Sequence, residues 1–208
     1  HSQTLLPMLD EIVKMTELDL ESIDAIAVAA GPGSFTGLRI GSATAKGLGL
    51  ALKKPLVAVP TVDALAYNLY DAQGVICPIM DARRKQVYTG IYRFEEHQLV
   101  TLKEQWAAPI EELLEELNHR SEMVTFLGDG VPVFRDLIAE KLQVPYSFAP
   151  AHVNKQRAAA VAALGNIYYK EGRTETAMEH VPEYLRVSQA ERERAEREKV
   201  QKQAGAEV

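Results

Sequence analysis

The apolar residues at the start of the chain recur at steps of three and four, which predicts an amphipathic helix over residues 2–18. Residues 23–30 are almost continuously apolar and form a run too short for a typical helix. We expect them to form a strand that is buried on both faces, as in a parallel sheet. The helical periodicity of the first segment is carried by Leu5, Met8, Leu9, Ile12, Val13 and Met15.

A βαβ unit is predicted next along the chain. A glycine-rich turn over residues 31–37 leads into a helix expected over residues 36–52, which Pro55 brings to an end. Residues 56–59 form a second buried apolar run, and Thr61 can cap another helix. The two strands of such a unit are expected to be parallel, with a right-handed crossover.

The pattern changes after Gly74. Residues 75–80 predict a strand, and Pro78 within it favours a position at the edge of a sheet. Residues 86–94 and 99–106 predict an antiparallel hairpin. A further strand is expected over residues 124–127, and helices are expected from Pro109, over 131–142 and over 158–170.

The chain is therefore expected to be an α/β protein of two lobes that meet near Gly74. The first lobe would span residues 1–74 and the second residues 75–208. Between residues 191 and 199 only Ala195 is uncharged, which predicts a solvated helix or a frayed tail.

The composition of the chain limits which classes of function it can have. The 208 residues are 47% apolar and carry a net charge of −6, so the chain has a core but is a poor unaided binder of nucleic acid. No apolar run is long enough to cross a bilayer. The single cysteine, Cys77, excludes an internal disulfide and favours the cytosol.

The glycine-rich turn does not match a nucleotide motif. Its third glycine, Gly37, comes one residue late for a dinucleotide fingerprint, and no lysine follows it as a P-loop requires. Two interpretations stay open. The turn is either a tight strand-to-helix connection capped by Ser34 or Thr36, or a direct phosphate contact through Gly33 and Ser34.

The helix after this turn carries small residues at steps of four. Each glycine costs about 1 kcal/mol relative to alanine inside a helix, so such a row indicates close packing, either within the chain or against a partner. The row consists of Gly37, Gly41, Ala45 and Gly49, and Gly47 adds another gap. The predicted partner-binding face consists of Leu5, Leu9, Ile12, Gly37, Ile40, Gly41, Thr44, Ala45, Leu48 and Gly49.

No catalytic or metal-binding constellation is predicted. The five histidines are scattered, without the spacing that puts two imidazoles on one helix face, and Cys77 lies in an apolar strand without a neighbouring base. Arg83, Arg84 and Lys85 form the densest charge cluster. We expect either a solvated hairpin there or a contact with an anion or an RNA phosphate.

Several segments together resemble the bacterial TsaB (YeaZ) family, which acts in tRNA threonylcarbamoyladenosine biosynthesis. The resemblance is carried, in this order, by residues 31–41, 45–48, 81–90, 128–130 and 182–186. It implies a two-lobed fold of the actin, sugar-kinase and heat-shock-chaperone type, which is ribonuclease-H-like. In that family a β-meander precedes the first helix, so the resemblance implies that the first lobe is truncated at its N-terminal strands.

The resemblance also implies a function. Members of the family are non-catalytic partners that bind and activate TsaD, which threonylcarbamoylates the adenosine next to the anticodon of tRNAs that read ANN codons. The expected assembly is a cytoplasmic heterodimer with TsaD, joined by the ATPase TsaE, with a homodimer when the chain is alone. ATP and a metal would be used by the partner complex and no cofactor by this chain, which would meet tRNA only through the complex.

An alternative is a stand-alone enzyme of the same superfamily, either a glycoprotease-like metallopeptidase or a kinase. TsaD carries a His-x-x-x-His metal pair, and the corresponding residues 60–66 contain no histidine, which argues against a peptidase. A phosphate loop ahead of His1 would favour a kinase.

Overall fold

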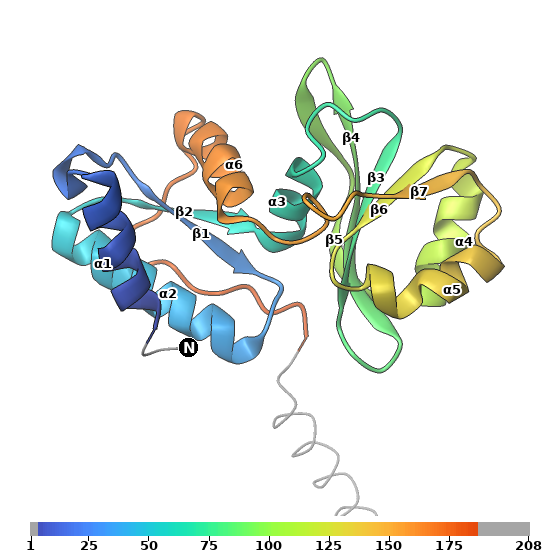
Figure 1. Ribbon diagram of the computed structural model, residues 1–208, viewed down its shortest axis with the longest axis horizontal. Coiled ribbons are helices and arrows are strands. Elements are labelled where there is room, and N and C mark those ends of the chain that lie inside the picture. Colours follow the sequence, from blue (N-terminus) through green and yellow to red (C-terminus); the bar gives the residue numbers. More distant parts are fainter. Residues whose placement is uncertain (1–3, 187–208) are drawn as a thin grey trace, which may run out of the picture.

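The computed structural model describes residues 4–186 and arranges them around two sheets (Figure 1). The helices are α1 (Leu5–Thr16), a 3-10 turn (Leu20–Ser22), α2 (Phe35–Leu52), α3 (Thr61–Tyr67), α4 (Ile110–Arg120), α5 (Val131–Lys141) and α6 (Ala158–Lys170). The strands are β1 (Ile26–Gly31), β2 (Leu56–Pro60), β3 (Val75–Asp81), β4 (Gln86–Glu95), β5 (Gln98–Pro109), β6 (Val124–Leu127) and β7 (Tyr146–Phe148).

The first sheet is the predicted βαβ unit. Strands β1 and β2 are parallel, with Ile26 opposite Leu56 and Ala29 opposite Val59. Helices α2 and α6 cover its two faces (Figure 1). On the α6 face Val57 and Val59 pack with Leu164 and Tyr168, while on the other face Val28 and Leu56 pack with Ala45 and Ala177. Burial of both faces explains why the two strands are nearly continuous apolar runs.

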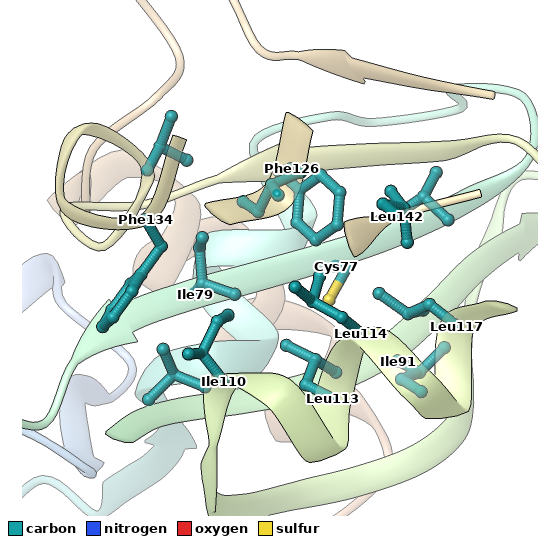
Figure 2. Close-up of a cluster of buried hydrophobic side chains, with 14 of the residues drawn as sticks. Cys77, Ile79, Ile91, Ile110, Leu113, Leu114, Leu117, Phe126, Phe134 and Leu142 are labelled. Carbon is teal, nitrogen blue, oxygen red and sulfur yellow. The ribbon is translucent and has the colours of Figure 1, made fainter. Parts of the chain in front are cut away.

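The second sheet has the strand order β5-β4-β3-β6-β7. Strands β3, β6 and β7 are parallel, and β4 and β5 form the expected antiparallel hairpin. Helices α4 and α5 pack on one face of this sheet over the largest apolar cluster (Figure 2). Its labelled members are Cys77, Ile79, Ile91, Ile110, Leu113, Leu114, Leu117, Phe126, Phe134 and Leu142.

The edge position predicted for residues 75–80 is wrong, because β3 lies between β4 and β6. Proline lacks the N–H that a central strand donates. The ladder between β3 and β4 accommodates Pro78 by leaving out its pairing, since the paired residues pass from Ile76 to Ile79. The carbonyl of Pro78 instead accepts a hydrogen bond of 2.7 Å from the Thr89 hydroxyl.

The other predicted helices and strands are confirmed to within three residues at their ends, whereas the three-residue strand β7 was not expected. The predicted cap at Thr61 is wrong, because Thr61 is the first residue of α3 and Pro60 is its N-cap, without a side-chain hydrogen bond. The lobe boundary near Gly74 stays a prediction. Helix α6, from the range assigned to the second lobe, packs on the first sheet. The charged segment 191–199 and any strands ahead of His1 lie outside the described residues. Among the described helices, none is long and apolar enough to cross a membrane.

Candidate functional site

Four segments that are distant in sequence come together at one end of the sheets. Residues 31–37 follow β1, residues 82–85 follow β3, residues 128–130 follow β6, and residues 182–186 return beside the tip of β1 (Figure 1). The first three follow the carboxyl ends of strands that have parallel neighbours, which is where open α/β sheets place their ligand sites.

The returning segment closes directly on the glycine-rich turn. The Glu183 N–H donates a hydrogen bond of 2.7 Å to the Ala30 carbonyl, and the ring of Tyr184 lies 4.8 Å from that of Phe35. Gly31 has a φ of +130°, and a Cβ there would lie 2.2 Å from the Glu183 carbonyl oxygen. Only glycine therefore permits this approach.

The same segment also reaches the turn after β3. Arg186 donates a hydrogen bond of 2.6 Å from Nη1 to the Ala82 carbonyl. On the other side of β3, the Asp81 N–H donates to Oδ1 of Asp129 at 3.4 Å, and the Gly130 N–H donates to the Ile79 carbonyl at 3.0 Å. Hydrogen bonds thus link residues 182–186 to the end of β1 and to the turn after β3, and link β3 to the turn after β6.

Of the two interpretations of the glycine-rich turn, the cap is confirmed. The Ser34 hydroxyl accepts a hydrogen bond of 3.4 Å from the Gly37 N–H and so caps α2. Thr36 is exposed in the first turn of that helix, and Gly33 is half-buried against Leu38. A phosphate contact at Gly33 and Ser34 stays a prediction.

The predicted basic cluster lies on the β3–β4 turn. Arg83, Arg84 and Lys85 are all exposed, and all three have left-handed backbone, with φ of 64°, 55° and 57°. This conformation is uncommon for residues other than glycine. The three cations therefore share one exposed loop whose backbone shape is unusual.

Helix α1 presents an apolar face that the described part of the chain does not bury. None of its residues is buried, and Ile12 is 54% exposed and Leu5 38% exposed. Leu9 is half-buried between them in sequence. The exposed large apolar side chains of this segment are Leu5, Leu6, Met8, Ile12, Met15 and Leu18. A contiguous set of this kind is typical of an interaction surface.

The small-residue row on α2 divides into two parts. Ala45 and Gly49 are buried inside the chain, and a Cβ on Gly49 would lie 2.5 Å from Cδ1 of Leu56. Added Cβ atoms on Gly41 and Gly47 would meet nothing within 4 Å, and one on Gly37 would meet only Ser34. The assignment of Ala45 and Gly49 to a partner-binding face is therefore corrected, because the close packing that they permit is internal.

The remaining α2 residues of the predicted face are accessible. Ile40, Gly41, Thr44 and Leu48 are half-buried, and Gly37 is exposed. The face that the structure leaves available therefore consists of these five residues together with Leu5, Leu9 and Ile12 of α1.

Asp63 joins three elements in a way that the sequence pattern did not indicate. It lies in the first turn of α3, where its carboxylate accepts hydrogen bonds from the Tyr92 hydroxyl at 2.7 Å and the Tyr168 hydroxyl at 3.2 Å. Burial raises the pKa of Asp63 above its ordinary value, although the two tyrosine hydrogen bonds oppose the shift. Burial also raises the pKa of Tyr168, to about 12.

A cavity of about 390 Å³ opens beside this carboxylate. Arg173 is the one cation among its lining residues, and its guanidinium lies 3.4 Å from the centre of the Tyr168 ring. The cavity is lined by Pro60, Asp63, Thr101, Glu104, Gln105, Tyr168, Arg173 and Glu183.

A buried pair of a histidine and a glutamate was also not predicted from the sequence. The side chain of His180 is fully buried, and its Nδ1 lies 2.6 Å from Oε1 of Glu175. Lys46 of α2 donates a hydrogen bond of 2.9 Å to the His180 carbonyl. This hydrogen bond links residues 175–180 to α2.

The described residues contain neither a metal-binding cluster nor a reactive cysteine. Among residues 4–186, no three or more histidine, cysteine, aspartate or glutamate side chains lie close enough together to hold a metal ion. Cys77 is fully buried, its Sγ lies 3.5 Å from Oγ1 of Thr89, and burial raises its pKa to about 12. It therefore stays a thiol at neutral pH.

Comparison with known proteins relates this arrangement to a set of tRNA-modification proteins. A family model described as "TsaD: tRNA N6-adenosine threonylcarbamoyltransferase" matches residues 1–194. The tRNA threonylcarbamoyladenosine biosynthesis protein TsaB of Bacillus subtilis is 33% identical over 92% of this chain and 82% of its own length.

Two further comparisons give a structure and a second kind of relative. The solved structure of YeaZ from Pseudomonas aeruginosa superposes with a TM-score of 0.73, at 26% identity over 89% of this chain and 84% of that chain. A tRNA N6-adenosine threonylcarbamoyltransferase of Protochlamydia amoebophila is 45% identical over 67 residues, which are 32% of this chain and 20% of that enzyme.

Proposed function

The chain belongs to the TsaB (YeaZ) family, and from that premise we propose that it binds TsaD and activates it in tRNA threonylcarbamoyladenosine biosynthesis. Its part in that biosynthesis follows from its family. The two-lobed fold of the actin and ribonuclease-H-like type follows in the same way. The choice of TsaD as the direct partner, and the activation, are the proposal.

The single observation that carries the proposal is the apolar face of α1. A 12-residue helix with no buried residue gains little from folding onto the rest of the described chain, so a partner that covers its apolar side chains would stabilise it. Met8 and Ile12, both more than half exposed, lie one helical turn apart in the middle of that helix. The available α2 residues, including the open position at Gly41, extend the surface.

TsaD suits this surface because the two proteins share a fold. The family model named for TsaD matches residues 1–194 of this chain, a range that includes α1 and α2. TsaD is thus expected to present a counterpart of the same helix pair, and two similar surfaces can pair about a pseudo-two-fold axis. The same geometry would allow a homodimer when TsaD is absent.

Activation would act through this contact. In the proposal, TsaD supplies the metal and the acceptor site, the ATPase TsaE joins the assembly, and this chain orders the TsaD helices that it covers. A ligand or partner shifts a conformational equilibrium only by its differential affinity for the two states. The chain would therefore bind the active arrangement of TsaD more tightly than the inactive one.

The test is co-elution of the two proteins in size-exclusion chromatography. Ile12→Asp places a charge in the centre of the α1 face and is expected to abolish the heterodimer. Glu11→Gln alters an exposed neighbour of Ile12 and serves as the matched control, which should bind normally. Because no residue of α1 is buried, the free energy of unfolding of both variants should lie within about 0.5 kcal/mol of the wild-type value. Normal co-elution of a folded Ile12→Asp variant would place the docking face elsewhere.

A further inference from the structure

Three consecutive cations lie on the turn that connects β3 and β4 (Figure 1 shows the two strands). Arg83, Arg84 and Lys85 are consecutive, exposed and left-handed. L residues enter this conformation mostly one at a time, and a run of three needs support from its surroundings. The structure supplies that support through residues on both sides of the turn.

Asp81 supports the start of the turn. Its Oδ1 accepts a hydrogen bond of 2.8 Å from the Arg83 N–H, and its Oδ2 lies 3.4 Å from Nη1 of the same arginine. Arg186 fixes Ala82, the residue before Arg83, because it donates a hydrogen bond of 2.6 Å to the Ala82 carbonyl. The returning segment 182–186 and the end of β3 therefore fix the loop together.

The far side of the turn leaves donors free. The Lys85 carbonyl accepts a hydrogen bond of 3.1 Å from the Ile110 N–H, which fastens the loop to the start of α4. By contrast, within the described chain the N–H groups of Arg84 and Lys85 donate to no protein acceptor. Successive N–H groups in a tight turn form a concave donor surface that binds anions.

We propose that residues 83–85 form a preformed phosphate-binding site and that its ligand is the phosphodiester backbone of tRNA. Two unpartnered backbone donors and three cationic side chains converge on the same loop, and both kinds of group favour a phosphate oxygen. Phosphate contacts of this kind position a nucleic acid without reading its sequence. The proposal rests on the proposed function, which brings tRNA to the complex.

A polynucleotide fits better than a free phosphate ion for two reasons. Residues 83–85 are exposed, so their attraction for a single small anion would be strongly screened by salt. The chain as a whole carries a net charge of −6, so it needs a local concentration of cations, such as residues 83–85, to attract a polyanion. A strand of RNA offers several phosphates to the three cations at once.

The first test measures tRNA affinity of the assembled complex with TsaD as a function of potassium chloride. Each phosphate contact contributes about 0.7 to 0.9 to the slope of log K against log salt. Replacing Arg83, Arg84 and Lys85 by glutamine is expected to reduce the slope by about 2 and the affinity at 0.1 M salt by about tenfold or more. Lys53→Gln with Lys170→Gln removes two exposed cations beside the first sheet and should leave the slope nearly unchanged.

The second test separates a built site from loose electrostatic attraction. Asp81→Ala removes a negative charge next to the cluster, so simple attraction predicts tighter tRNA binding. The proposal predicts weaker binding, by about threefold to tenfold, because Arg83 loses both of its contacts to Asp81 and the turn loses its shape. Tighter binding by a folded Asp81→Ala variant would overturn the preformed site, and an unchanged salt slope in the triple variant would overturn the phosphate contact.

The two proposals fail in different ways. If the wild-type chain does not co-elute with TsaD, the proposed function fails, and the same titration on the chain alone at low salt still tests residues 83–85. If the triple variant co-elutes with TsaD and keeps the wild-type salt slope, only the phosphate site fails. Inorganic phosphate serves as the competing probe. Its failure to displace tRNA at millimolar concentration is the expected result, and displacement there would identify a site for the free ion instead.

Discussion

The hydroxyl of Tyr92, on β4 of the second sheet, donates a hydrogen bond of 2.7 Å to the carboxylate of Asp63 in the first turn of α3. Tyr168 of α6 donates to the other oxygen of the same carboxylate. The Asp63 side chain therefore links α3 to α6 and to strand β4 of the second sheet.

Removing this junction should weaken the fold. Asp63→Ala leaves the fully buried Tyr92 without a partner for its hydroxyl, and an unsatisfied buried donor costs about 1 to 3 kcal/mol. Urea unfolding of the variant and of Tyr92→Phe checks the value. The double variant should cost less than the sum of the two single losses, and strict additivity would contradict a direct interaction.

The same carboxylate gives a pH dependence with a defined sign. Its pKa is raised in the folded protein, so the folded state binds more protons than the unfolded state above pH 4. The stability of the wild type should therefore fall relative to that of Asp63→Asn as the pH rises from about 4 through the folded-state pKa. Equal slopes for the two proteins over this range would contradict the raised pKa.

The two halves of the α2 row should respond differently to the same substitution. Gly41→Ala fills open space and improves helix propensity, so it should stabilise the isolated chain by up to about 1 kcal/mol. Gly49→Ala forces Leu56 and the Lys54 carbonyl to shift, so it should gain nothing or lose stability. Thermal melts of the two variants measure this difference in stability. Equal gains in stability at both positions would contradict the internal packing of Gly49.

Gly31 and Gly33 form a second matched pair. Gly31→Ala combines a positive φ with a clash against the Glu183 carbonyl, so it should lower the free energy of unfolding by about 1 to 3 kcal/mol. It should also make residues 182–186 accessible to proteases. Gly33→Ala makes only ordinary contact with Leu38 and should be tolerated. Limited proteolysis followed by mass spectrometry would show cleavage in that segment for the first variant alone.

Periodicity and buried apolar runs were enough to predict the order of the helices and strands, because each of those signals is local. Pro78 misled the prediction, since its missing donor is accommodated by an interrupted ladder and a side-chain hydrogen bond from Thr89. A three-residue strand such as β7 carries too little pattern to be recognised.

The functional surfaces were predictable only in part. The spacing of the apolar residues indicated the apolar face of α1, and the cluster 83–85 was recognisable from its charge. The contacts of Asp63 with Tyr92 and Tyr168 span 29 and 105 residues of sequence, and no local pattern encodes them. Likewise, Gly41 and Gly49 belong to the same row at steps of four, and that spacing does not show which of them faces open space. Only the packed structure shows that Gly41 is open and that Gly49 packs inside the chain.

The most direct measurement of the central claim is the yield of threonylcarbamoyladenosine in tRNA, measured by nucleoside mass spectrometry in a reaction reconstituted with TsaD and TsaE. We expect product formation to depend on this chain and Ile12→Asp to reduce it about tenfold or more, with partial recovery at high variant concentration. Glu11→Gln should match the wild type. Full activity of Ile12→Asp, or equal product in the absence of the chain, would contradict the claim that it binds and activates TsaD through α1.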